Sequence, residues 1–238
     1  MKHLLTTAAL AALLAPLASA YDLNVTIRQG SFQVSPGGEF VAVTSPTTFL
    51  GNYAATAKQQ VNVNGQRVWG FSTFCLEKDE NLSTAGNYVG NLSDKAQKGG
   101  VNTDSGDPIS LGTAWLYYQF AKGTLAGYAY GTAPYDNAEV TARKTSAGAL
   151  QNAIWILEEE QASASNTFID AAMAALGTDL AGLMADANGA YGVKAINLYS
   201  ANGGDRQDVL VLPDGGTTLV MLGGGVLALA MLRRRQTA

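Results

Sequence analysis

The stretch Leu150-Gln151-Asn152-Ala153-Ile154-Trp155 carries the clearest structural pattern in the chain. Leu150, Ile154 and Leu157 are spaced by four and three residues, which is the spacing of one apolar face of a helix. Upstream, Asp136 and Glu139 have the spacing of a capping box, in which two side chains satisfy the first backbone N–H groups of a helix. The pattern predicts a helix over residues 138–160.

Gln151 lies at the edge of this apolar face, one turn after Ala147 and one turn before Trp155. Its side-chain amide is therefore expected to be partly buried against other structure. A buried amide without hydrogen-bond partners costs about 1–3 kcal/mol, so we expect partners for it. From periodicity alone, the interpretation is a core helix that carries one hydrogen-bonded glutamine.

The first third of the chain is strand-rich. Residues 24–27 and 40–44 alternate polar and apolar side chains, and Pro36-Gly37-Gly38 predicts a turn between them. Residues 61–63 and 68–74 flank Asn64-Gly65, the strongest short signal for a β-hairpin in the chain. Cys75, the only cysteine, then falls at or just past a strand end.

The rest of the sequence separates helices from strands. Residues 82–107 are polar and rich in Gly, Asn, Ser and Lys, and we interpret them as a mobile surface excursion. Helices are predicted over residues 111–121, 138–160 and 167–185, the last a pair broken near Gly177, and strands over 193–199 and 209–212. This order predicts an α+β domain, residues 21–211, with a β-sandwich or barrel-like sheet and a segregated helical layer.

Both ends of the chain carry targeting signals. Residues 1–20 have the pattern of a signal peptide, with Lys2, an apolar run and the small residues Ala18-Ser19-Ala20 at the cleavage site. Residues 212–238 begin with Leu212-Pro213-Asp214-Gly215-Gly216, and the uncharged residues 217–232 then predict a membrane helix. Three arginines follow, and they are expected to stay in the cytoplasm and leave the domain outside: Arg233, Arg234 and Arg235.

The tail resembles the exosortase-type sorting signals (PEP-CTERM), in particular the VPDSG-CTERM variant with Val-Pro-Asp-Ser/Gly-Gly. Pro213, Asp214, Gly215 and Gly216 match that variant, and Leu212 replaces its valine. The tail also resembles the sortase signal Leu-Pro-x-Thr-Gly, but Gly215 stands where that signal has threonine. The resemblance implies an exosortase-like enzyme as a processing partner. A plain single-pass anchor is the alternative.

Composition excludes several classes of function. Without the two targeting ends, eleven Lys and Arg stand against eighteen Asp and Glu, and a net charge near −7 argues against nucleic acid as a partner. The only histidine, His3, lies in the signal peptide, so the exported chain lacks the imidazole of a Ser-His-Asp or Cys-His hydrolase. One cysteine without histidine does not make a zinc site, and we expect no cofactor. Calcium on surface carboxylates stays open, although Asp104-Ser105-Gly106-Asp107 is too short and irregular to define a site.

A lone cysteine in an exported protein has several interpretations. Cys75 cannot form an intrachain disulfide, and it does not follow the signal cleavage site as a lipoprotein cysteine would. A disulfide-linked dimer, a buried inert thiol and a covalent bond to Gln151 remain.

Phe74-Cys75-Leu76 at a strand end, followed later by the Leu150 to Trp155 motif, resembles the thioester domains of bacterial surface adhesins. The resemblance covers residues 39–212 and includes residues 114–120, which are similar to the family's first helix. It implies an internal thioester between the sulfur of Cys75 and the side-chain carbonyl of Gln151. Phe74, Trp115 and Trp155 are the expected walls of the dry pocket around this bond.

The function implied is that of a single-use cross-linker, not a turnover enzyme. The thioester would pass its acyl group to an amine on a surface protein or polymer and leave an amide at Gln151. Gln119 is the second candidate acyl donor. The alternatives are a non-reactive structural component of the matrix or envelope, a carbohydrate-binding domain, and an intramolecular Lys–Asn isopeptide. The carbohydrate interpretation would use four tyrosines: Tyr117, Tyr118, Tyr128 and Tyr130.

Overall fold

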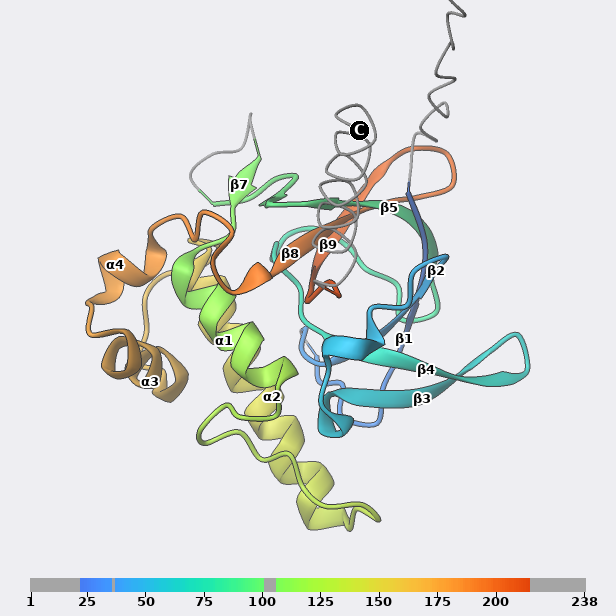
Figure 1. Ribbon diagram of the computed structural model, residues 1–238, viewed down its shortest axis with the longest axis horizontal. Coiled ribbons are helices and arrows are strands. Elements are labelled where there is room, and N and C mark those ends of the chain that lie inside the picture. The colour runs from blue at the N-terminus through green and yellow to red at the C-terminus, as the bar shows by residue number, and fades with distance from the viewer. Residues whose placement is uncertain (1–21, 36, 101–105, 215–238) are drawn as a thin grey trace, which may run out of the picture.

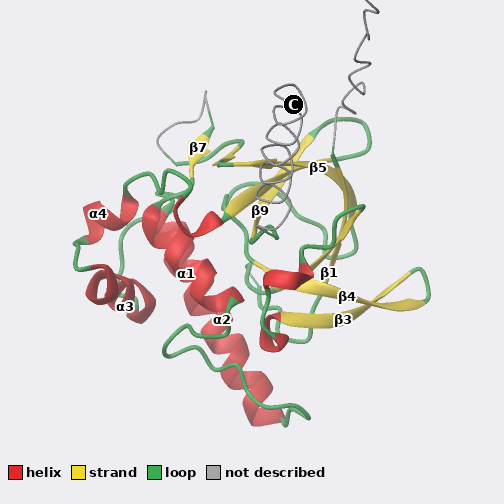
Figure 2. Cartoon of the chain, in the orientation of Figure 1, coloured by secondary structure: helices red, strands yellow, loops and turns green. Residues whose placement is uncertain are grey.

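The computed structural model describes residues 22–35, 37–100 and 106–214. Within these residues, one antiparallel sheet of seven strands lies beside four α-helices that gather on one side of it (Figures 1 and 2). The expected α+β class is confirmed. The signal peptide, the membrane helix and the three arginines that the sequence predicts fall outside the described residues.

The sheet has the strand order β3-β4-β2-β1-β5-β8-β9. Its strands are β1 Leu23–Arg28, β2 Phe40–Ser45, β3 Lys58–Val63, β4 Gln66–Thr73, β5 Asn87–Ser93, β8 Lys194–Tyr199 and β9 Asp205–Val211. A separate two-stranded ribbon pairs β6 Lys95–Ala96 with β7 Asp107–Pro108. The helices are α1 Leu111–Ala121, α2 Asn137–Leu157, α3 Thr167–Leu176 and α4 Leu180–Met184. Short 3-10 turns are η1 Leu50–Asn52, η2 Ala55–Ala57 and η3 Ala190–Gly192.

The sheet curls until its last strand meets the chain that continues from β4. Cys75 pairs with Val209 of β9. The N–H of Leu210 donates to Phe74 O and the N–H of Leu76 donates to Asp208 O, both at 3.0 Å. The sheet is therefore barrel-like, and β3 remains outside the closure as an edge strand.

Local sequence signals explain several elements. Asn64 and Gly65 both have positive φ, 52° and 84°, as the two-residue turn between β3 and β4 requires. Asp136 and Glu139 form the predicted capping box of α2. Gly177, with φ 63°, ends α3 in the left-handed conformation, so the break in the predicted helix pair is confirmed.

The interpretation of residues 82–107 as a surface excursion is wrong for their central part. Residues 87–93 form β5, which lies between β1 and β8 inside the sheet. Its buried positions alternate, but they are occupied by Tyr88 and Gly90 instead of an aliphatic run. A Cβ on Gly90 would lie 2.8 Å from Ile196 Cγ2 and 2.9 Å from Asn197 O, so close packing against β8 replaces side-chain bulk.

Two predicted boundaries are also wrong. The strand expected over residues 209–212 begins earlier, at Asp205, because the buried Asp208 is held by hydrogen bonds and does not interrupt the sheet. The helix expected over residues 138–160 ends at Leu157. Glu159, with φ 60°, turns the chain there.

Candidate functional site

Cys75 lies where the sheet closes on itself. In its pairing with Val209 the flanking residues make the hydrogen bonds, so the N–H and C=O of Cys75 point away from β9. These two groups would be unsatisfied in the interior unless another element reached them.

The side chain of Gln151, on α2, reaches both groups. Its Oε1 accepts from the N–H of Cys75 and from the N–H of Gly38, each at 3.0 Å. Its Nε2 donates to Cys75 O at 2.8 Å. Because all three partners are backbone groups of fixed polarity, they define which end of the side chain is oxygen and which is nitrogen. The carboxamide thus takes the place of a peptide group in a neighbouring strand.

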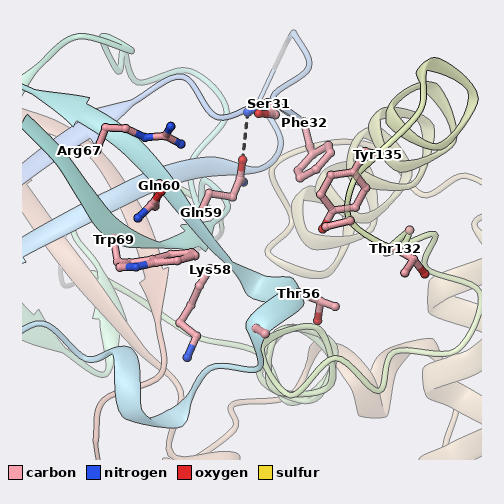
Figure 3. Close-up of a pocket in the computed structure, with 13 residues that line it drawn as sticks. Ser31, Phe32, Thr56, Lys58, Gln59, Gln60, Arg67, Trp69, Thr132 and Tyr135 are labelled. Atoms are coloured by element: carbon pink, nitrogen blue, oxygen red, sulfur yellow. Dashed lines mark hydrogen bonds between the residues drawn. The ribbon is translucent and has the colours of Figure 1, made fainter.

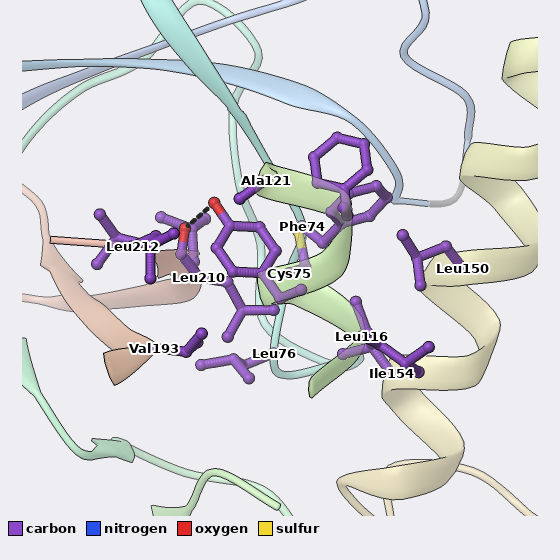
Figure 4. Close-up of a cluster of buried hydrophobic side chains, with 14 of the residues drawn as sticks. Phe74, Cys75, Leu76, Leu116, Ala121, Leu150, Ile154, Val193, Leu210 and Leu212 are labelled. Carbon is purple, nitrogen blue, oxygen red and sulfur yellow. Dashed lines mark hydrogen bonds between the residues drawn. The ribbon is translucent and has the colours of Figure 1, made fainter. Parts of the chain in front are cut away.

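This pairing is sealed from solvent. Both Cys75 and Gln151 have 0% of their surface exposed. Figure 4 shows the sulfur inside a cluster of apolar side chains, with Leu150 and Ile154 of α2 on one side. Burial raises the pKa of the Cys75 thiol well above its usual value, and the charge of Glu77 adds to the effect. An unbonded Cys75 is therefore a neutral thiol at neutral pH.

The donors around Gln151 Oε1 resemble an oxyanion hole. Two backbone N–H groups point at one carbonyl oxygen in a dry interior, where such donors stabilise developing negative charge most strongly. One of the two donors is the backbone N–H of Cys75, so the residue that carries the sulfur is in direct contact with the Gln151 carboxamide. The arrangement fits addition of a nucleophile to the carboxamide carbon of Gln151.

The roof over the carboxamide is a backbone segment without side chains. Gly37 and Gly38 have φ values of 77° and 83°. A Cβ on Gly37 would lie 2.7 Å from Gln151 Cγ and 2.9 Å from Trp155 Cη2. Only glycine fits this close approach.

The three expected pocket walls lie in different places. Trp155 is 2% exposed, contacts the underside of the Gly37 roof and donates from Nε1 to Glu77 O at 3.3 Å. Phe74 is fully buried, and its ring meets Phe120 edge-on at 4.9 Å between ring centroids. Trp115 is half-buried and packs at the margin of the core. Trp155 and the Gln151 side chain thus lie under the same glycine, Gly37.

A buried ion pair that the sequence did not predict lies next to the site. The Glu39 carboxylate receives both a 3.0 Å bond from Arg143 Nε and a 2.5 Å bond from Arg143 Nη2, and both side chains are fully buried. Ser72 Oγ and Gln59 Nε2 also donate to Glu39 Oε1, at 3.0 and 3.2 Å, and Tyr128 Oη donates to Oε2 at 2.6 Å. Glu39 follows Gly38 directly, so this network anchors the roof segment.

A signal for the ion pair was present in the sequence. Arg143 lies eight residues before Gln151 and four before Ala147, on the same face of the helix. A charge on a buried face needs a buried partner of opposite charge. The partner, Glu39, could not be identified from sequence because it lies in another element, 104 residues away.

A second polar cluster lies beyond Cys75. Glu77 Oε2 accepts from the N–H of Asp208 at 2.7 Å, and Oε1 accepts from the N–H of Lys98 at 3.0 Å. Burial, together with the charge of Asp208, raises the pKa of Glu77 to about 8. Burial raises the pKa of Asp208 to about 7. Both carboxyls therefore hold their protons more tightly than exposed Asp and Glu side chains do.

The remaining candidates are placed elsewhere. Gln119 accepts a 2.6 Å hydrogen bond from Thr124 Oγ1 near the end of α1. Tyr117 and Tyr128 are buried in the core, and Tyr118 and Tyr130 are partly buried against it, so the tyrosines do not form an exposed sugar-binding face. Among the described residues, no group of three His, Cys, Asp or Glu side chains could hold a metal ion. Across the same residues, no helix has the length and apolarity needed to cross a membrane.

Comparison with known families adds a finding at the C-terminus. Residues 213–236 match the VPDSG-CTERM motif. The match supports the predicted sorting signal at Pro213, Asp214, Gly215 and Gly216, and with it export, surface sorting and an exosortase-like processing enzyme. No curated protein matches the chain, and no solved structure matches it.

Proposed function

We propose that Cys75 and Gln151 form an internal thioester, and that this surface-sorted protein uses the bond once to capture an amine on a partner. The observation that carries the proposal is the Gln151 carbonyl, held between the backbone N–H groups of Cys75 and Gly38 in a dry interior. The adhesin-type motif around both residues and the VPDSG-CTERM tail support the same function.

Bond formation is a condensation of two neighbouring side chains. The Cys75 sulfur attacks the carboxamide carbon of Gln151, and negative charge develops on Oε1, where two N–H groups stabilise it. Collapse of this adduct breaks the bond from carbon to Nε2, and the thiol proton leaves with the nitrogen as ammonia. Positioning of the two groups by the fold replaces an external activating enzyme.

In the capture step the Cys75 sulfur is the leaving group and the amine of the partner is the nucleophile. An amine attacks the same carbon, the carbon–sulfur bond breaks, and the products are an amide at Gln151 and a free Cys75 thiol. Because Cys75 and Gln151 are fully buried, water is kept from the bond until the amine arrives. Displacement of the Gly37–Gly38 roof, which contacts the Gln151 side chain, would open the carboxamide to the amine.

Intact mass tests the proposal. Purified protein should be lighter than its sequence mass by one ammonia, and Cys75→Ala and Gln151→Ala should each keep the full mass. Methylamine should add to Gln151 and expose one titratable thiol. Gln119→Ala is the matched control and should keep the mass deficit, because Gln119 bonds Thr124 and not Cys75. Full sequence mass together with a thiol that titrates in native protein would refute the thioester.

A non-reactive structural component is the second candidate. The three backbone hydrogen bonds of Gln151 also satisfy it as an ordinary core side chain, so they are compatible with a purely structural role. Native protein at full mass that ignores methylamine would favour this function.

Sorting gives a separate prediction. If the VPDSG-CTERM motif is processed, protein recovered from the cell surface should lack residues 217–238, because cleavage at the motif removes everything that follows it. Peptide mapping of the C-terminus measures this. Asp214→Ala, which changes the motif, should reduce processing, and Asp170→Asn, an exposed change on α3, should not. Surface protein with an intact tail would instead indicate a plain anchor.

A further inference from the structure

An open groove of about 600 Å³ lies between the β3–β4 hairpin and the loop that precedes α2. Figure 3 shows Trp69, Gln60 and Arg67 on the hairpin side, with Phe32 and Tyr135 facing them. Gln60 and Trp69 are direct partners across the two strands. The floor is fixed, since Gln59 Oε1 accepts from the N–H of Ser31 at 3.0 Å.

The groove gathers exposed aromatic surface. Among the described residues, only three large hydrophobic side chains are exposed: Trp69 at 53%, Leu92 at 38% and Tyr135 at 36%. Two of these three line the groove. Tyr135 is held in place by an edge-on contact with Phe32, at 4.9 Å between ring centroids. Trp69 and Tyr135 line the same groove, and grouped exposed aromatic surface of this kind is typical of binding sites.

The charge in the groove is opposite to that of the whole chain. Lys58 and Arg67 line it, and none of its lining residues is acidic. Within the described part of the chain, neither cation takes part in an ion pair. The acidic side chain of Glu139 contacts the lining, since its Oε1 accepts from the N–H of Thr132 at 3.1 Å. The whole chain carries a net charge of −4, so two cations without an ion-pair partner in one groove favour an anionic ligand there.

We propose that this groove binds an acidic saccharide, a glycan chain that carries carboxylates on some of its sugars. The flat C–H face of a pyranose ring packs on the indole of Trp69 and the ring of Tyr135. Its hydroxyls meet Gln60 and Thr132, and a carboxylate is held by Arg67 or Lys58. The site is independent of the Cys75–Gln151 chemistry.

The small number of cations in the groove favours a sparsely charged glycan over nucleic acid. Nucleic acid carries a charge on every nucleotide and draws its affinity from several phosphate contacts, whereas the groove offers two cations on an acidic protein. A sparsely charged glycan needs no more than that. A peptide rich in carboxylates would be attracted by the same two cations, but it would not present flat sugar faces to the two aromatic rings.

Isothermal titration with hexagalacturonate tests the proposal. The wild-type chain should bind it, and Trp69→Ala should weaken binding by about tenfold or more, because a Trp side chain that is covered by the ligand contributes a large share of the binding energy. Arg67→Gln combined with Lys58→Gln should weaken binding and reduce its dependence on salt. Leu92→Ala and Lys95→Gln are matched controls outside the groove, one apolar and one charged, and should leave binding unchanged.

Three comparison ligands make the result decisive. Maltohexaose has the same length without charge, hexaglutamate has the charge without sugar rings, and a single-stranded DNA hexamer has stacking bases with phosphates. Each should bind more weakly than hexagalacturonate. Tighter or equal binding of any of the three, no binding of hexagalacturonate, or full binding by Trp69→Ala would overturn the proposal. Trp69 is 53% exposed, so its replacement is compatible with folding, and a thermal melt verifies this.

Discussion

Arg143→Met should lower the free energy of unfolding by about 3–5 kcal/mol, because it leaves the Glu39 carboxylate charged and unpaired in the interior. Arg143 also donates to Thr56 O at 2.5 Å and to Tyr130 O at 2.9 Å, and its guanidinium lies 3.9 Å from the Phe32 ring centroid. Removal therefore breaks contacts with several elements at once. Urea denaturation followed by circular dichroism measures the loss.

A double variant separates lost pairing from lost packing. Glu39→Gln combined with Arg143→Met removes both charges, so it should be more stable than Arg143→Met alone. Lys144→Met, a neighbouring change on the same helix at a half-buried position, should have a much smaller effect. If Arg143→Met costs no more than Lys144→Met, the ion pair does not stabilise the fold.

The ion pair also connects stability with the proposed chemistry. Glu39 has a φ of 24°, which is unfavourable for a residue with a side chain, and the five hydrogen bonds to its carboxylate hold it there. The preceding N–H, that of Gly38, is one of the two donors to Gln151 Oε1. If the thioester forms, a variant that keeps the fold but loosens Glu39 should form it more slowly.

Local signals in the sequence were sufficient for the elements that flank the site. The Asn64-Gly65 turn, the Asp136 cap and the Gly177 stop each act over a few residues, so each could be predicted from neighbours alone. The expected contact between Cys75 and Gln151 came from a family resemblance. The structure places their backbone and side-chain groups in hydrogen-bond contact.

The features that were missed depend on contacts between distant segments. β5 has the polar composition of a loop, and it becomes a strand because β1 and β8 pair with it on both sides. The start of β9 carries Asp205, Arg206 and Asp208, and the carboxylate of Asp208 is satisfied only by groups from other strands and loops. Such partners cannot be recognised from neighbouring residues, so β5 and the start of β9 were both predicted to be loops.

Stability should fall as the pH rises from 5 to 8, by at least about 2 kcal/mol. Burial raises the pKa of Glu77 to about 8 and those of Asp208, Asp107 and Glu158 to about 7. In the unfolded chain these carboxyls ionise near pH 4, so the folded protein binds their protons more tightly. This stabilisation is complete below pH 4 and is lost as the pH passes through 7 and 8.

Urea denaturation at pH 5, 6, 7 and 8 measures this dependence. Glu77→Gln removes one of the titrating groups while keeping its size, so the slope of unfolding free energy against pH should flatten between pH 6 and 8. Asp170→Asn, an exposed change on α3, should keep the wild-type slope. Stability that rises from pH 5 to 8 would show that these carboxyls hold no extra protons in the folded state. An unchanged slope in Glu77→Gln would show the same for Glu77.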